Sequence, residues 1–144
     1  MSILLSEQIQ KGISTELRSL LYFTEKGYLC SIPYGNVGRY DLLVDTGKKI
    51  VRIQCKSAHK NDNGSYTVNT SNTAIKANGN VRKFYTKDEI DFIITFIENQ
   101  AVFIPVEMIE KSQSKIFRTE LPKYGTKSNC NLIQDYTFEK IFDN

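Results

Sequence analysis

A carboxylate at Asp41 and the pair Gln54 and Lys56 have the residue types of a site that handles phosphate and a metal ion. Gln54 and Lys56 lie two residues apart in an alternating segment, so both project from the same face of a strand. Hard divalent cations take carboxylate and amide oxygens as ligands. A nearby lysine can orient or deprotonate water, or neutralise charge that develops on phosphate. These side chains predict metal-dependent phosphodiester chemistry.

Two expected strands position these side chains. Residues 40–45 form an apolar run that opens with the acid, residues 46–49 supply a turn, and residues 50–56 alternate. Arg52 therefore shares a face with Gln54 and Lys56, while Val51, Ile53 and Cys55 point into the core. The same alternation is typical of any half-exposed strand, on which Arg52 and Lys56 would only keep the sheet soluble.

These segments resemble the PD-(D/E)XK nuclease superfamily. Its signature is an acid that opens one strand and an acid-x-lysine element on the next, here Asp41 followed by Gln54-Cys55-Lys56. Segments 40–44 and 50–58 look most like the small single-domain branch, which includes bacterial intron-encoded homing endonucleases and is similar to archaeal Holliday-junction resolvases. Gln54 stands where most of the superfamily has Asp or Glu, and the intron-type branch is similar in tolerating Gln there. With Asp91 and Ile104-Pro105-Val106, the resemblance extends over about residues 16–106.

The resemblance implies a metal site for Mg²⁺, with Mn²⁺ as a substitute. The candidate metal ligands are Asp41, Gln54 and Cys55, and the amide of Gln54 offers an oxygen although it lacks the charge of a carboxylate. Lys56 would act on water and on the charge of the transition state. Asp91 is expected to be structural, as a turn or cap residue.

An amphipathic helix is predicted over residues 6–26, with Gly27 as its stop signal. Its apolar stripe is formed by residues at helical spacing, namely Ile9, Ile13, Leu17, Leu20, Leu21 and Thr24. Glu16 projects from within or beside this stripe. It either pairs with a neighbouring cation or approaches the metal or a water beside Asp41. Members of the superfamily that resemble this chain carry such a helical Glu, which favours the second role.

Basic and aromatic residues outside the strands predict contacts to DNA. Two lie next to Asp41, others lie in residues 72–87, expected as a loop, and others lie in the polar segment 112–131. Cations interleaved with aromatic rings suit phosphates and stacked bases. Plain exposed loops have the same composition, so that alternative stays open. The candidate DNA-binding residues are Arg39, Tyr40, Arg82, Lys83, Lys115, Arg118, Lys123 and Lys127.

Length and composition predict one domain over residues 1–144. The net charge of +3 argues only weakly for DNA, so a binding surface requires local clustering. Cys30, Cys55 and Cys130 are odd in number and lack metal-ligand spacing. The chain begins without an export segment, and no apolar run approaches the roughly 20 residues that span a bilayer. We therefore expect a cytoplasmic protein without membrane contact.

The expected fold class is α/β, with a restriction-endonuclease-like mixed central β-sheet flanked by helices. Besides the two strands at the site, strands are expected over residues 28–32, 65–70, 91–97 and 101–104. Residues 61–64 predict the turn of a hairpin. A short helix is expected over residues 107–111, and a closing helix over residues 134–142.

The residues and the resemblance together predict a Mg²⁺-dependent DNA endonuclease of homing or junction-resolving type, acting on duplex or branched DNA. Its candidate catalytic residues are Glu16, Asp41, Gln54 and Lys56. A DNA-binding protein that kept the fold and lost cleavage is the first alternative, because Gln54 is neutral. A structural subunit of a larger complex is the second.

Cutting two strands with one site per domain predicts a homodimer or homotetramer. The interface is expected at the apolar strands of residues 92–103 and at residues 138–142.

Overall fold

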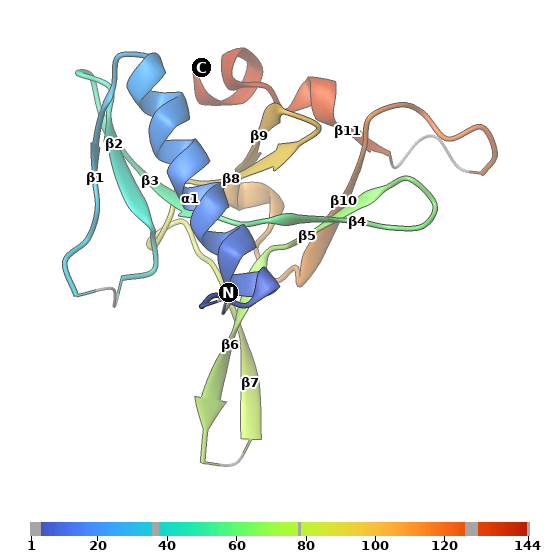
Figure 1. Ribbon diagram of the computed structural model, residues 1–144, viewed down its shortest axis with the longest axis horizontal. Helices are drawn as coiled ribbons and strands as arrows, with labels where there is room; N and C mark the ends of the chain where they lie inside the picture. Colours follow the sequence, from blue (N-terminus) through green and yellow to red (C-terminus); the bar gives the residue numbers. More distant parts are fainter. Residues whose placement is uncertain (1–3, 36–37, 78, 126–129, 144) are drawn as a thin grey trace.

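The computed structural model describes residues 4–35, 38–77, 79–125 and 130–143. Within these ranges the chain forms one long helix, a five-stranded sheet, a four-stranded sheet and a two-stranded hairpin (Figure 1). None of the helices in this part of the chain is long and apolar enough to span a bilayer.

Helix α1 (Glu7–Glu25) begins and ends where the sequence predicts. The Ser6 hydroxyl accepts a hydrogen bond from the Ile9 N–H at 3.3 Å and caps the first turn. Gly27 follows the helix with φ of +86°, a conformation that favours glycine. The face that packs on the sheet differs from the predicted stripe, because Ser19 and Phe23 are buried while the Ile9 to Leu21 row lies in solvent.

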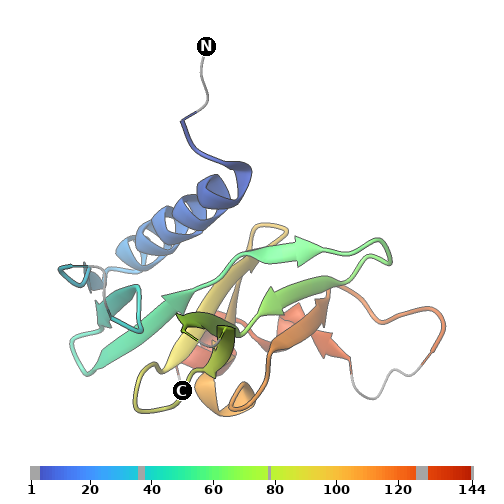
Figure 2. The same cartoon turned by 90° about the horizontal axis from the view of Figure 1, so that it is seen from below.

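The central sheet has the order β1-β2-β3-β8-β9. Its strands are β1 (Leu29–Ser31), β2 (Leu42–Asp45), β3 (Ile50–Cys55), β8 (Phe92–Ile97) and β9 (Gln100–Pro105). β3 and β8 run parallel and the other neighbours run antiparallel, so the sheet is mixed, as predicted. Helix α1 lies along one side of it (Figure 2).

Alternation along the strands divides the core into two clusters. On β3, Val51, Ile53 and Cys55 are buried, which confirms the predicted pattern of that strand. On β8, Ile93 and Ile94 belong to different clusters because successive side chains point to opposite faces. The centre of the sheet is therefore packed on both faces.

A second sheet follows the site strand, in the order β11-β10-β5-β4. It contains β4 (Ala58–Lys60), β5 (Tyr66–Asn69), β10 (Ser114–Arg118) and β11 (Asn131–Leu132). β4 and β5 form the predicted hairpin. β10 corrects the expectation of an exposed segment over 112–131, because it pairs with β5 and buries Phe117 completely.

The segment expected as a loop over residues 72–87 is mostly a hairpin. β6 (Ser71–Lys76) and β7 (Gly79–Phe84) pair along their whole length. Polar residues dominate this segment, and they conceal the strand alternation in the sequence. Figure 1 shows the hairpin projecting away from the rest of the molecule.

The C-terminal part forms short turns where longer helices are expected. η1 (Val106–Met108) replaces the helix over 107–111, and η2 (Ile133–Asp135) and η3 (Phe138–Phe142) replace the helix over 134–142. Phe138 and Phe142 stack at 4.9 Å between ring centres and pack against Phe103. Phe103, Phe138 and Phe142 are buried, so these three residues do not form the predicted interface, whereas Phe92 and Phe96 are only partly buried. The three buried residues form the core beneath α1.

Candidate active site

Asp41 is fixed against β3 by two hydrogen bonds. Its N–H donates to the Ile53 carbonyl at 2.8 Å, and its Oδ2 accepts from the Cys55 N–H at 2.8 Å. Oδ1 has no hydrogen-bond partner among the described residues. Burial raises the pKa of Asp41, although the Cys55 N–H and the charge of Lys56 act in the opposite direction. One carboxylate oxygen is thus held in place while the other is left for a ligand.

Lys56 directly follows β3 and is partly buried. Its N–H donates to the Ile94 carbonyl at 3.0 Å, which ties the backbone to β8. Its Nζ donates to the Ser71 carbonyl at 3.3 Å and lies 5.3 Å from the centre of the Tyr85 ring. Burial lowers the pKa of Lys56, attraction to Asp41 opposes this, and repulsion from Arg39 adds to it. A lysine with a lowered pKa releases its proton more readily than an exposed lysine does.

Glu16 reaches the site because α1 is tied to the end of β3. Thr15 Oγ1 and Ser57 Oγ form a hydrogen bond of 2.9 Å, and the Cys55 thiol donates to Ser19 Oγ at 3.4 Å. Partial desolvation, followed by repulsion from Asp41, raises the pKa of the Glu16 carboxyl. Neighbouring carboxylates that disfavour each other's charge form a place where a cation is stabilised.

The four candidate catalytic residues line one pocket with a volume of about 480 Å³. Gln54 enters from β3, and its amide makes no hydrogen bond within the described part of the chain. Sequence reasoning missed several other lining residues, because their types carry no signal at those helical and hairpin positions. They include Gln8, Lys11, Gly12, Thr15, Ser57, His59 and Asn69.

The donor set fits a hard divalent cation. The Cys55 thiol is unsuitable, since it faces α1 and burial raises its pKa to about 12. A strand residue directs its N–H and carbonyl to the same edge, so the Cys55 carbonyl lies on the side of Asp41. Asp41, Gln54 and Cys55 therefore offer only oxygens here. In the described ranges, no three His, Cys, Asp or Glu residues gather as a metal site.

Two predicted DNA contacts are engaged inside the protein. Arg39 pairs with Glu89 at 2.7 Å, and its guanidinium lies 4.7 Å from the centre of the Tyr85 ring. Tyr40 packs against the core. Tyr85, which sequence reasoning did not single out, is buried next to both Arg39 and Lys56. Only the fold brings it to Lys56.

Arg52 lies on the same face of β3 as Gln54, but it pairs with Asp91 and does not line the pocket. Its Nη2 lies 3.1 Å from Asp91 Oδ1, and its N–H donates to Asp91 Oδ2 at 2.8 Å. Burial alone would raise the pKa of Asp91, but the contacts with Arg52 together lower it. Asp91 is therefore structural, as the sequence predicts, and joins β3 to the start of β8.

The other candidate DNA-binding residues lie outside the pocket. Lys83 on β7 and Lys123 are exposed, Lys115 on β10 is partly buried, and Arg118 donates to the Asn63 carbonyl at 3.5 Å. Arg82 belongs to β7, but its side chain is outside the described part of the structure, as is the whole of Lys127. The described members of this set do not line the Asp41 pocket.

The mixed sheet places Asp41 opposite Gln54-x-Lys56, and Glu16 on the packed helix lines the same pocket. The profile of the PD-(D/E)XK endonuclease family matches residues 6–139, and the chain belongs to this family. The predicted family and the predicted restriction-endonuclease-like fold are thereby confirmed, and the chain is a nuclease by family.

Among the solved structures that match is a bacterial homing endonuclease, I-Ssp6803I. The two chains superpose with a TM-score of 0.76 at 21% sequence identity, over 91% of this chain and 88% of that chain. At this identity the likeness shows a shared fold. A search of curated proteins found no match.

Proposed function

We propose that the chain is a divalent-metal-dependent DNA endonuclease that hydrolyses phosphodiester bonds in the Asp41 pocket. The observation that carries this proposal is the arrangement of Asp41 and Lys56. One oxygen of Asp41 is held by the Cys55 N–H, the other is open, and a lysine of lowered pKa lines the same pocket. An anchored carboxylate beside a desolvated cation suits a reacting phosphate.

The oxygens of Asp41, Gln54 and Cys55 would hold the metal ion. Mg²⁺ fits an all-oxygen set with few protein charges, and Mn²⁺ would substitute for it. When bound, the ion neutralises phosphate charge and makes water easier to deprotonate. The raised pKa of Asp41 fits this role, because the Cys55 N–H and the charge of Lys56 compensate only in part for the burial of the carboxylate.

Lys56 and Glu16 would hydrogen-bond to the attacking water and orient it. Nζ of Lys56 is held at Ser71 and over Tyr85, so it is positioned before substrate arrives. Lys56 orients the water by a hydrogen bond and, as an ammonium group, stabilises the negative charge that develops on phosphorus oxygens. Glu16, on the helix side of the pocket, accepts a hydrogen bond from the same water.

DNA would contact the projecting β6–β7 hairpin and the basic residues of β10 and of the segment that follows it. A two-stranded ribbon has the width of the major groove, and exposed Lys83 lies on this hairpin. Lys115, Arg118 and Lys123 would bind backbone phosphates. The likeness to a homing endonuclease supports duplex DNA as substrate, so a four-way junction is the comparison substrate.

The proposed function also calls for a homodimer or a homotetramer. The described residues form a single pocket with this chemistry, and two antiparallel strands must be cut in two orientations. A two-fold axis supplies the second orientation.

One specific feature favours a DNA-binding protein without cleavage as the second candidate. Gln54 leaves Asp41 as the only charged ligand on the strands, which weakens affinity for a divalent cation. Such a protein would bind DNA with equal affinity in EDTA and in Mg²⁺.

Incubation of the purified protein with supercoiled plasmid and with a four-way junction decides between these candidates. Each substrate is tested with Mg²⁺, Mn²⁺ or EDTA, with Lys56→Ala as the matched control. We expect cleavage of plasmid in both metals, none in EDTA and none by the variant. Binding without cleavage by the wild-type protein would favour the second candidate, and equal cleavage in EDTA would exclude the metal site.

A further inference from the structure

Helix α1 exposes a row of large apolar side chains at intervals of four residues. Ile9, Ile13, Leu17 and Leu21 are 53%, 42%, 60% and 59% exposed. Leu5 lies just before the helix, continues the same spacing in the sequence and is 42% exposed. The row contains no charged residue, and its members lie along one side of the helix because four residues make slightly more than one turn.

No other element of the described structure covers this row. Ser19 and Phe23 are buried on the side of α1 that packs against the sheet. Figure 2 shows that no other element covers the side of α1 that faces away from the sheet. The four helical side chains together present on the order of 400 Å² of apolar surface, within the range of the largest patch on a typical monomer. That area is about half of the roughly 800 Å² per partner of a standard interface.

We propose that the α1 rows of two copies of this chain pack against each other across a two-fold axis. A two-fold interface joins the same patch on both subunits, so an uncharged apolar row is complementary to itself. Rows of residues four apart are also the ridges that interdigitate in the commonest class of helix packing. Ile13 and Leu17 would form the centre of such a contact.

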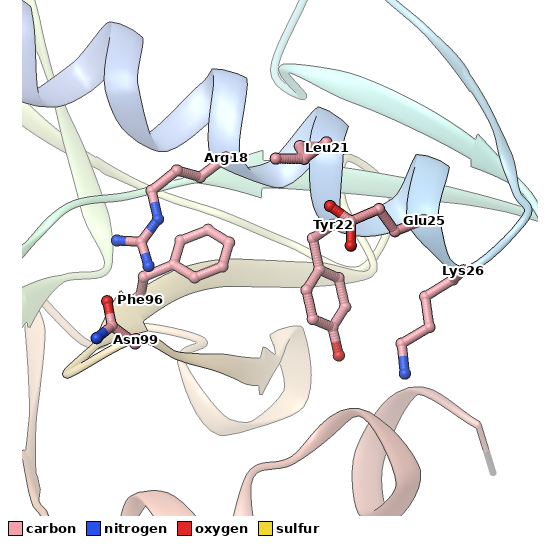
Figure 3. A pocket seen from close by; sticks show the side chains of 7 residues that line it. All are labelled: Arg18, Leu21, Tyr22, Glu25, Lys26, Phe96 and Asn99. Carbon is pink, nitrogen blue, oxygen red and sulfur yellow. The ribbon is translucent and has the colours of Figure 1, made fainter.

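A hollow at the C-terminal end of the row supplies further contact area. It has a volume of about 410 Å³ and lies between α1 and the β8–β9 turn. Leu21 stands at its edge, and Arg18 lies over the Phe96 ring at 4.2 Å from the ring centre (Figure 3). Leu21, Tyr22 and Phe96 give the hollow apolar and aromatic surface, while Arg18, Glu25 and Lys26 add charged groups at its lining.

The choice of a second copy rests in part on the proposed function, which needs two pockets to cut two strands. Helix α1 forms one wall of the catalytic pocket through Lys11, Thr15 and Glu16. Pairing through the opposite side of this helix would join two pockets through one rigid element while leaving both open. The apolar row itself requires a partner whether or not the chain cleaves DNA.

Sedimentation velocity of the full-length protein over a range of micromolar concentrations tests the interface. We expect a dimer for the wild-type chain and a monomer for Leu17→Glu, with the dissociation constant raised at least about 100-fold. Ile116→Glu is the matched control, because Ile116 is 52% exposed on β10, and it should remain a dimer. Circular dichroism must show that both variants are folded.

Plasmid cleavage separates failure of the interface from failure of the proposed function. Leu17→Glu should still nick one strand but lose the coupled cutting that linearises plasmid. A wild-type protein that never cleaves DNA, yet forms a dimer that Leu17→Glu dissociates, would keep the interface and reject the nuclease. A monomeric wild-type chain at every concentration, or an unchanged dimer in a folded Leu17→Glu protein, would overturn the interface.

Discussion

At the scale of single residues, the candidate site combines one anchored carboxylate, Asp41, with one partly buried lysine, Lys56. Asp41 has a hydrogen-bonded oxygen and an open one, and Lys56 is held by Ser71 and Tyr85. Both pKa values move toward neutrality because burial disfavours both charges. Such perturbed pairs are typical of groups that exchange protons or bind ions.

Replacing Lys56 by Ala should remove activity while leaving DNA affinity intact. A cation aimed at the reacting phosphate stabilises the transition state more than bound substrate, so we expect a loss of about 100-fold to 10,000-fold in turnover. Single-turnover cleavage and gel-shift titration measure the two effects separately. A Lys56→Ala protein that cuts at the wild-type rate would exclude Lys56 from the mechanism.

Asp41→Asn should stabilise the apo protein and abolish its response to metal. Asn still accepts from the Cys55 N–H but carries no buried charge. The pKa of Asp41 is raised in the folded state, so its contribution to stability is full below the ordinary Asp range and declines as pH rises. At neutral pH we expect a gain of about 1 kcal/mol in the free energy of unfolding, shrinking as the pH is lowered.

Thermal unfolding with and without Mg²⁺ or Mn²⁺ provides the second readout. Saturation at 100 times the dissociation constant stabilises the wild-type fold by about 2.7 kcal/mol, whereas Asp41→Asn should show no such shift. Gln54→Glu adds a ligand charge and should strengthen the shift. An equal shift in wild type and Asp41→Asn would place the metal elsewhere.

Tyr85 provides a test of how Lys56 is held in position. Its hydroxyl is buried without a hydrogen-bond partner among the described residues, while its ring contacts Arg39 and Lys56. Tyr85→Phe keeps the ring and removes a polar atom whose burial costs about 1 to 3 kcal/mol. Urea unfolding should therefore show Tyr85→Phe to be more stable, with cleavage nearly unchanged. Tyr85→Leu, which lacks the ring, should lower both stability and turnover.

At the scale of elements, periodicity predicts the strands that carry the site, and local sequence predicts where α1 starts and stops. β3 alternates as expected, and Ser6 and Gly27 bound the helix. Periodicity could not predict which side of α1 is buried, because both sides contain apolar residues. The β6–β7 hairpin was not predicted, because its composition is that of a loop. Its register also depends on cross-strand pairing, which local sequence does not show.

The projecting hairpin should set DNA affinity without taking part in chemistry. We expect Lys83→Ala to lower the slope of log affinity against log salt by about one ion. Lys123→Ala should act in the same way from the segment between β10 and β11. Gel-shift titrations at several salt concentrations measure this slope, and cleavage by bound protein should be unchanged. A slope equal to that of wild type would remove the substituted residue from the DNA contact.

At the scale of the whole molecule, composition and resemblance predict one nuclease domain, and the fold supplies what they leave out. The convergence of Glu16, Asp41, Gln54 and Lys56 on one pocket was predictable from motif and helix position. The roles of Arg52, Arg39 and Tyr85 were not, since their partners lie between 35 and 50 residues away or are fixed only by packing. Aromatic content alone could not distinguish a core from an interface.

The aromatic cluster at the C-terminus should therefore carry stability for the whole chain. Phe142 is 2% exposed and contacts rings from α1, β8 and β9, namely Phe23, Phe92 and Phe103. Phe142→Ala should cost about 3 to 5 kcal/mol, a large part of the 5 to 15 kcal/mol of a typical domain. Ile116→Ala, at an exposed position on β10, should cost about 0.5 kcal/mol or less. Urea unfolding compares the stability of the two variants. The cluster also contains Val51, Ile53 and Cys55 of β3. Phe142→Ala should therefore lose cleavage activity at the temperature at which it unfolds. A Phe142→Ala protein as stable as Ile116→Ala would contradict the assignment of this cluster to the core.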